Sequence, residues 1–157
     1  MSIPRNMNPA EPDFDLFSSP FYLIAHVDFK YHEDLDRVMQ KYEVDRTTYR
    51  LLSVLLAVGL ENIKVICEHA LVKRSTGSRA IDRMLEKGWV RTESNEADYR
   101  STTVELTAEG KKIAGMLRQS TSKQLERAAD GLSAAELKQL ASILRRMTEN
   151  LGRLQIE

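Results

Sequence analysis

Basic and hydroxyl side chains cluster at the start of a helix that the sequence predicts over residues 73–87. They are Lys73, Arg74, Ser75, Thr76, Ser78 and Arg79. The N-terminus of a helix offers unpaired backbone N–H groups and the positive end of the helix dipole to anions such as phosphates. Hydroxyl groups bond phosphates or base edges, and an arginine donates two hydrogen bonds to one guanine. These residue types at a helix start predict contact with nucleic acid.

The charge of this segment differs from that of the whole chain. The 157 residues carry 23 basic and 23 acidic side chains, so the net charge is zero. Residues 72–83 carry four basic side chains and one acidic side chain, a local charge of +3. Four basic residues ordinarily indicate only a solvated helix face. The neighbouring elements must therefore show whether this segment binds nucleic acid. Gly77 weakens the helix by about 1 kcal/mol relative to alanine, and we expect its missing side chain to allow close approach to DNA.

Helical periodicity and capping residues place this segment after three other helices. Apolar residues at spacings of three and four predict a helix over residues 21–43. Asp45 and Asn62 are typical N-caps of a second and a third helix, and Gly59 ends the second. A turn at residues 71–72 separates the third helix from the basic one. This order is that of a helix-turn-helix unit.

Two short strands are predicted after Gly88, which ends the basic helix. Residues 89–92 and 102–106 have the composition and alternation of strands, and a polar loop over residues 93–101 joins them. Thr107 is a typical cap of a fifth helix. A strand, loop and strand after a helix-turn-helix form a winged helix-turn-helix unit, which binds DNA.

The last predicted helix carries a regular apolar seam. It follows Ser133 and Glu136, whose spacing is that of a capping box. Its apolar residues are Leu137, Leu140, Leu144, Met147, Leu151 and Leu154. Alternating spacings of three and four are typical of packing against another helix, and we expect that helix to come from a second subunit. An ordinary helix packed within one chain is the alternative.

Three motifs follow one another across the predicted strands. Residues 83–91 read RMLEKGWVR, residues 98–101 read DYRS, and residues 104–110 read VELTAEG. In this order and spacing the sequence resembles the MarR family of transcription regulators, over about residues 21–154. The resemblance implies an α+β, mostly helical protein, a winged helix-turn-helix homodimer that binds double-stranded DNA at a short inverted repeat.

The resemblance also implies roles for single residues. Arg100 matches a wing arginine that enters the minor groove, and Asp98 matches the acidic residue that shapes the wing tip. Ser75, Thr76, Ser78 and Arg79 match positions that face the major groove. Lys73 stands where many members have a polar capping residue. Base preference is therefore not transferred from a relative.

We expect three regions along the chain. Residues 1–17 hold three of the four prolines and should form a flexible arm. Residues 45–107 should form the winged helix-turn-helix region. Residues 18–44 together with 108–157 match the helices that dimerise in the family.

In the family, a small molecule, often an aromatic acid, binds where the dimerisation helices meet the winged domain, and DNA is released. The residues that we expect to line such a site are His26, Lys30, Tyr49 and Arg50. Lys30 or Arg50 suits an anion and Tyr49 an aromatic ring, and an acyl thioester of coenzyme A is a larger alternative. Each residue also has an ordinary explanation, as a solvated cation or a core tyrosine. The expected function is a repressor released by a small ligand.

Other functional classes have less support. Cys67, the single cysteine, lies on the apolar side of its predicted helix, where burial is more typical than redox sensing. His26 and His32 lack the spacing of metal ligands, and we expect no cofactor. No phosphate-binding loop or nucleophile motif predicts an enzyme. No apolar run is long enough to span a bilayer, so we expect a cytoplasmic protein. A redox-sensing regulator and a helical scaffold that does not bind DNA stay open as alternatives.

Overall fold

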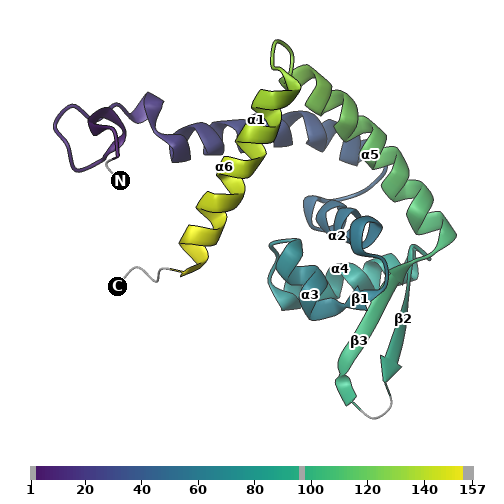
Figure 1. Ribbon diagram of the computed structural model, residues 1–157. Helices are drawn as coiled ribbons and strands as arrows, with labels where there is room; N and C mark the ends of the chain where they lie inside the picture. The colour runs from purple at the N-terminus through teal and green to yellow at the C-terminus, as the bar shows by residue number, and fades with distance from the viewer. Residues whose placement is uncertain (1–2, 96–97, 154–157) are drawn as a thin grey trace. The chain divides into compact units, whose positions relative to one another are not determined.

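The computed structural model describes the backbone of residues 3–95 and 98–153, and their side chains except those of residues 94, 95, 98–101 and 153. The chain forms two compact units, one up to Thr121 and one from Ser122 onward. Helices dominate both units, and a small antiparallel sheet belongs to the first (Figure 1). This is the mostly helical α+β architecture that the sequence predicts.

The N-terminal segment, expected to be a flexible arm, forms a closed loop with two short 3-10 helices. These are η1 (Arg5–Met7) and η2 (Leu16–Ser18). The Asp15 N–H donates a hydrogen bond of 2.8 Å to the Asn6 carbonyl and closes the loop between them. The Arg5 guanidinium lies 3.2 Å from the Glu11 carboxylate on the same loop.

The first long helix, α1 (Pro20–Lys41), buries only the later part of its apolar surface. His32, Leu35 and Met39 are buried, whereas Ile24 and Val27 are 39% and 69% exposed. Both belong to the spacing of three and four, at positions 24, 27, 31, 35, 38 and 42, from which the sequence predicts this helix. The core of the single chain contacts the later turns of α1 and leaves the earlier ones uncovered.

Caps and glycines set the limits of the helix-turn-helix unit. Its helices are α2 (Arg46–Val58), α3 (Ile63–His69) and α4 (Arg74–Glu86). The Asp45 carboxylate accepts a hydrogen bond of 2.7 Å from the Thr48 N–H and caps α2. The Asn62 side chain accepts one of 2.8 Å from the Lys64 N–H and caps α3. Gly59, with a φ of +78°, ends α2 as predicted.

The sheet has three strands in the order β1-β3-β2, and both pairs are antiparallel. The strands are β1 (Glu61–Asn62), β2 (Val90–Asn95) and β3 (Asp98–Leu106). Val104 at the centre pairs with Glu61 on one side and Thr92 on the other. The strands of the wing extend beyond the predicted residues 89–92 and 102–106, because cross-strand pairing continues through polar residues. β1 was not predicted.

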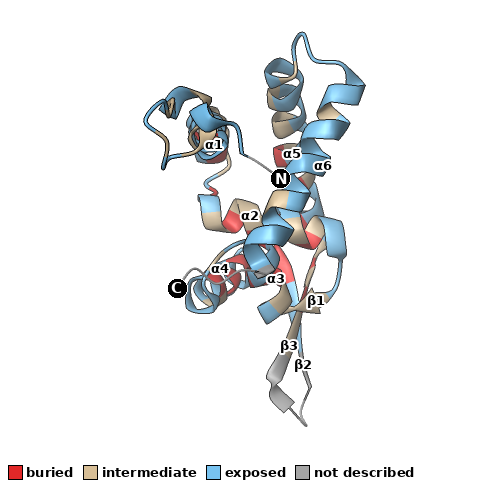
Figure 2. Cartoon of the chain, turned by 60° about the vertical axis from the view of Figure 1, so that its left-hand side comes forward, coloured by how far each residue is buried: buried red, intermediate tan, exposed pale blue. Residues whose placement is uncertain are grey.

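The hydrophobic core lies where the helix-turn-helix unit meets the base of the wing. Figure 2 shows buried residues gathered around α2, α3 and α4. Leu51, Leu52, Ile66, Ile81 and Val104 are each at most 1% exposed. Burying one such side chain stabilises the fold by about 1.5–3 kcal/mol. The core therefore holds α4 firmly by one face and leaves its opposite face to solvent.

Two long helices complete the chain. They are α5 (Ala108–Ala128) and, in the second unit, α6 (Ala134–Arg153). The predicted capping box at the start of α6 is confirmed: the Ser133 N–H donates to Glu136 Oε2 (2.8 Å) and the Glu136 N–H donates to Ser133 Oγ (3.2 Å). Along the predicted seam of α6, Leu140 and Leu151 are 49% and 56% exposed in the single chain. Leu154 lies outside the described residues.

Candidate nucleic-acid interface

A tight turn presents the N-terminus of α4 at the surface. Leu71 has a φ of +55°, and the Val72 N–H donates a hydrogen bond of 3.0 Å to the Cys67 carbonyl. Lys73 is the N-cap residue of α4, and its side chain makes no capping hydrogen bond. The first backbone N–H groups of α4 therefore have no side-chain cap at Lys73, and they are available to an anion.

The residues predicted to contact DNA surround this helix end. Lys73, Arg74, Ser75, Thr76 and Arg79 are exposed and Ser78 is half-buried. The inner side of the helix carries the buried Gly77, Ala80, Ile81 and Met84. Within the described part of the chain, no hydrogen bond or ion pair involves the side chains of the three cations. Their positive charge is therefore uncompensated by contacts in the chain.

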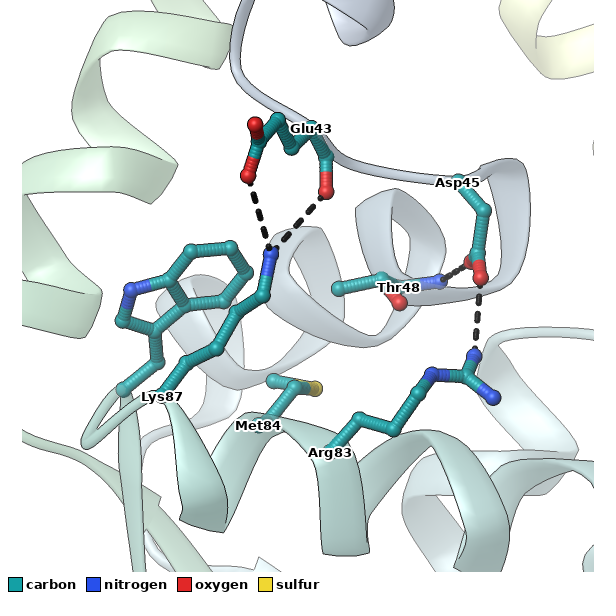
Figure 3. A pocket seen from close by; sticks show the side chains of 7 residues that line it. Glu43, Asp45, Thr48, Arg83, Met84 and Lys87 are labelled. Atoms are coloured by element: carbon teal, nitrogen blue, oxygen red, sulfur yellow. Dashed lines mark hydrogen bonds and ion pairs between the residues drawn. The ribbon is translucent and has the colours of Figure 1, made fainter.

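The basic residues at the other end of α4 contact acidic residues (Figure 3). The Arg83 guanidinium donates to the Asp45 carboxylate over 2.8 Å. Lys87 Nζ donates to the Glu43 carbonyl over 3.2 Å and lies 3.9 Å from its carboxylate. These residues line a small cavity of about 140 Å³. The charge of +3 counted over residues 72–83 is thus not spread along the helix, because Arg83 is neutralised by Asp45.

Gly77 does not face DNA, which corrects our expectation for it. The residue is buried, and a Cβ placed on it would lie 2.3 Å from Cys67 Sγ on α3. Glycine is required here by packing between α3 and α4. Cys67 is 2% exposed, and burial raises the pKa of its thiol. Both properties disfavour the redox-sensing alternative, since the reactive form of a cysteine is the exposed thiolate.

The wing is held at its base by the residues of the VELTAEG motif. The Thr107 hydroxyl donates a hydrogen bond of 2.7 Å to the Gly88 carbonyl and accepts one of 3.1 Å from the Gly110 N–H. The Thr107 N–H donates to the Trp89 carbonyl over 3.0 Å. These bonds tie the end of α4, the end of β3 and the start of α5 together. The positions of Asp98 and Arg100 fall in β3, but their side chains lie outside the described residues.

A second feature is a cavity of about 300 Å³ between α1, the start of α2 and the turn before α4. It is lined by Asp28, Tyr31, His32, Tyr49, Arg50, Ser53, Val54, His69, Ala70 and Leu71. The hydroxyl oxygens of Tyr31 and Tyr49 are 2.7 Å apart. Burial and this hydrogen bond raise the pKa of Tyr31 above its ordinary value. The His32 Nδ1–H donates to the Asp28 carbonyl over 2.8 Å, which fixes the buried ring.

The structure brings together only two of the four residues expected to bind a ligand. Tyr49 and Arg50 line the cavity, whereas His26 and Lys30 do not. The His26 ring lies 4.2 Å from the ring of Tyr22, and Lys30 Nζ lies 2.7 Å from the Glu33 carboxylate.

Sequence reasoning missed the α1 residues that do line the cavity, Asp28, Tyr31 and His32. A usable signal existed, because helical spacing of three and four continues the buried positions Leu35 and Met39 back to these three.

Within the described residues, no group of three or more histidine, cysteine or acidic side chains is placed to hold a metal ion. The same part of the chain contains no helix that is both long and apolar enough to cross a membrane.

Known proteins with similar sequences identify the family. A sequence model of the MarR family matches residues 42–101. The chain is 31% identical to the HTH-type transcriptional repressor IacR of Pseudomonas putida over 147 residues, which are 94% of this chain and 88% of the relative. The chain belongs to the MarR family.

Other members agree in sequence and fold. The HTH-type transcriptional regulator PecS of Dickeya dadantii is 29% identical over 105 residues, 63% of this chain and 62% of PecS. The crystal structure of a MarR family regulator from Silicibacter pomeroyi is 25% identical, with a TM-score of 0.81 over 92% of this chain and 96% of that one. Apo MarR from E. coli shares the fold, with 22% identity and a TM-score of 0.67 over 82% and 95%.

These relatives are transcription regulators, not enzymes, and this MarR family chain is a DNA-binding transcription regulator. MarR family regulators bind DNA and act as dimers.

Proposed function

We propose that this regulator binds a short inverted repeat in double-stranded DNA as a homodimer, and represses transcription until a small aromatic anion binds. The exposed N-terminus of α4 carries the proposal, because Lys73, Arg74 and Arg79 form no ion pair within the described residues. In a two-fold dimer, two such helices would enter major grooves about 34–36 Å apart. Arg100 would add a contact from the wing in the minor groove, whose negative potential attracts arginine.

The test of α4 as the recognition helix is the substitution Arg79→Ala. We expect it to relax base preference and to weaken DNA binding by roughly 1–3 kcal/mol, because an arginine reads guanine with two hydrogen bonds. Arg83→Ala is the matched control: it removes the same charge one turn further along α4, where the side chain is bonded to Asp45 (2.8 Å).

The measurement is a gel-shift titration at several salt concentrations. Its probe is a duplex that the parent protein selects from a randomised pool. Equal affinity and equal base preference for the parent and Arg79→Ala would refute the assignment.

We propose that residues 18–44 and 108–157 form the dimerisation region. Exposed apolar side chains on α1 and on α6 support this, among them Val27 (69%) and Leu140 (49%). An isolated chain rarely leaves a long apolar seam in water unless a partner covers it. Leu140→Glu should convert the dimer to a monomer in light-scattering measurements, whereas Arg79→Ala should leave it dimeric. A dimer that persists in Leu140→Glu would argue against a role of the α6 seam.

We propose that the effector binds in the cavity of about 300 Å³ lined by α1 and α2. Arg50 supplies a cation and the Tyr31–Tyr49 pair supplies aromatic faces and hydroxyl groups. The volume is at the lower end of the range for ligand pockets, about 300–1,000 Å³. It therefore favours a small aromatic acid over a thioester of coenzyme A.

The effector proposal is tested by thermal-shift screening with benzoate, hydroxybenzoates and benzoyl-coenzyme A. A ligand that binds the folded protein raises its melting temperature by mass action. The same ligand should weaken DNA binding, and DNA should weaken ligand binding by the same factor. Arg50→Ala should abolish the shift, and Lys30→Ala, a cation outside the cavity, should keep it. Equal loss in both variants would mean that the cavity is not the binding site.

A further inference from the structure

Gly77 lies in the contact between α4 and α3, and the fit there is specific to one atom. A Cβ on residue 77 would lie 2.3 Å from Cys67 Sγ, 3.5 Å from Val72 Cγ2 and 3.7 Å from Cys67 Cβ. The last two distances are ordinary contacts, and only the sulfur is too close. Alanine at position 67 would lack this sulfur atom. Glycine is therefore needed at position 77 because residue 67 is a cysteine.

The close-packed surroundings of Cys67 resist movement of its sulfur away from position 77. Cys67 is 2% exposed, and its carbonyl accepts the hydrogen bond of 3.0 Å from the Val72 N–H that forms the turn. One of the three χ1 rotamers is disfavoured in a helix, and a close-packed core resists rotation into another. A side chain at position 77 must instead move α4 away from α3. The displacement is roughly 1.2–1.7 Å, which restores a contact distance of about 3.5–4 Å from the 2.3 Å of the unrelaxed position.

We infer that Gly77, matched to Cys67, is a positioning residue for DNA recognition, because it sets how closely α4 packs on α3 and hence where Arg79 lies. The inference rests on the proposed role of α4 as the recognition helix. Gly77 is buried, so a methyl group added there cannot touch DNA, and any effect on binding must pass through the position of α4. Binding groups have to be held within about 0.5 Å of their productive geometry, less than the displacement that the methyl group imposes.

The test is a pair of substitutions in the full-length protein, with binding measured on the duplex selected from a randomised pool. Gly77→Ala should weaken specific binding at least about tenfold, the loss of one good arginine–guanine contact. Adding Cys67→Ala to it should restore the affinity to within about threefold, because the Cβ-to-Cβ distance of 3.7 Å remains an ordinary contact. Gly115→Ala is the control, since a Cβ there meets nothing within 4 Å in its own chain; light scattering first checks that it stays dimeric, because Gly115 lies in the proposed dimerisation region.

The outcomes separate the inference from the proposed function. Parent-like binding by Gly77→Ala, alongside weakened binding by Arg79→Ala, would overturn the inference and leave the recognition helix in place. Weak binding by Gly77→Ala that Cys67→Ala does not restore would also overturn it. If Gly77→Ala fails to fold, the double variant decides, because it should fold, dimerise and bind. Unchanged binding by Arg79→Ala would instead contradict the proposed function.

Discussion

Gly110 offers a sharp test of how the wing is anchored. A Cβ on this residue would lie 1.9 Å from the Trp89 carbonyl oxygen and 2.8 Å from its carbonyl carbon. A carbon atom ordinarily approaches such an oxygen to about 3.3–3.6 Å. The start of α5 and the start of β2 would have to separate by more than 1 Å, and the hydrogen bond of 3.0 Å from the Thr107 N–H to the same oxygen would be strained.

We therefore expect Gly110→Ala to destabilise the protein. Overpacking costs about 1–3 kcal/mol, and a weakened hydrogen bond adds about 1 kcal/mol. Replacing a helical glycine by alanine stabilises a helix by about 1 kcal/mol. The net loss in the free energy of unfolding is therefore about 1–3 kcal/mol. For a chain of this size that lowers the melting temperature by roughly 2–4 °C per kcal/mol.

The assay is urea unfolding followed by circular dichroism at one fixed protein concentration, because a dimer's stability depends on concentration. Gly115→Ala is the control, which has open space in its own chain and should be neutral or stabilised by up to about 1 kcal/mol. Equal stabilities for the two variants would refute the role of Gly110 in the close packing at the base of the wing.

Two further predictions concern titratable groups. Burial alone would raise the pKa of Asp45, but hydrogen bonds from Thr48 and the charge of Arg83 outweigh it and hold the pKa below its usual value. Asp45 thus contributes stability that is present above its unfolded pKa of about 3.9 and is lost as pH falls through its folded pKa. Asp45→Asn keeps a capping oxygen but does not titrate. In acid unfolding experiments, its free energy of unfolding should therefore change less with pH over that range. In alkaline titrations followed by phenolate absorbance, Tyr49→Phe should lower the pKa of Tyr31, because it removes the hydrogen bond that helps to raise it; an unchanged titration would contradict the pairing.

Local signals in the sequence predicted the helices well. Asp45, Asn62 and Ser133 were predicted as caps, and each accepts the expected backbone hydrogen bond. Gly59 and Gly88 were predicted as helix ends, and both have positive φ. These signals are reliable because a cap and the N–H group that it satisfies lie within three residues of each other. A single sequence therefore contains both partners of the interaction.

Features that depend on distant residues were not predictable in the same way. β1 exists because Glu61 pairs with Val104, more than forty positions later. The need for a glycine at position 77 depends on Cys67, which lies on another helix. Which face of α1 is buried also depends on distant residues, and the early apolar residues Ile24 and Val27 are exposed in the single chain. Apolar residues that are exposed in the single chain obscure which helix face packs against the core of that chain.

The cavity proposed for the effector and the end of α4 proposed to contact DNA are separated by one turn. His69, Ala70 and Leu71 line the cavity, and α4 begins at Arg74. The far end of α4 is held by the core, where Ile81 and Met84 are 1% and 0% exposed. An occupant that displaces the turn would therefore tilt α4 about its fixed end and move the cationic end most.

A tilt that moved α4 away from α3 would break the close contact of Gly77 with Cys67. The loss of that contact would add to the free energy that an effector has to supply to release DNA.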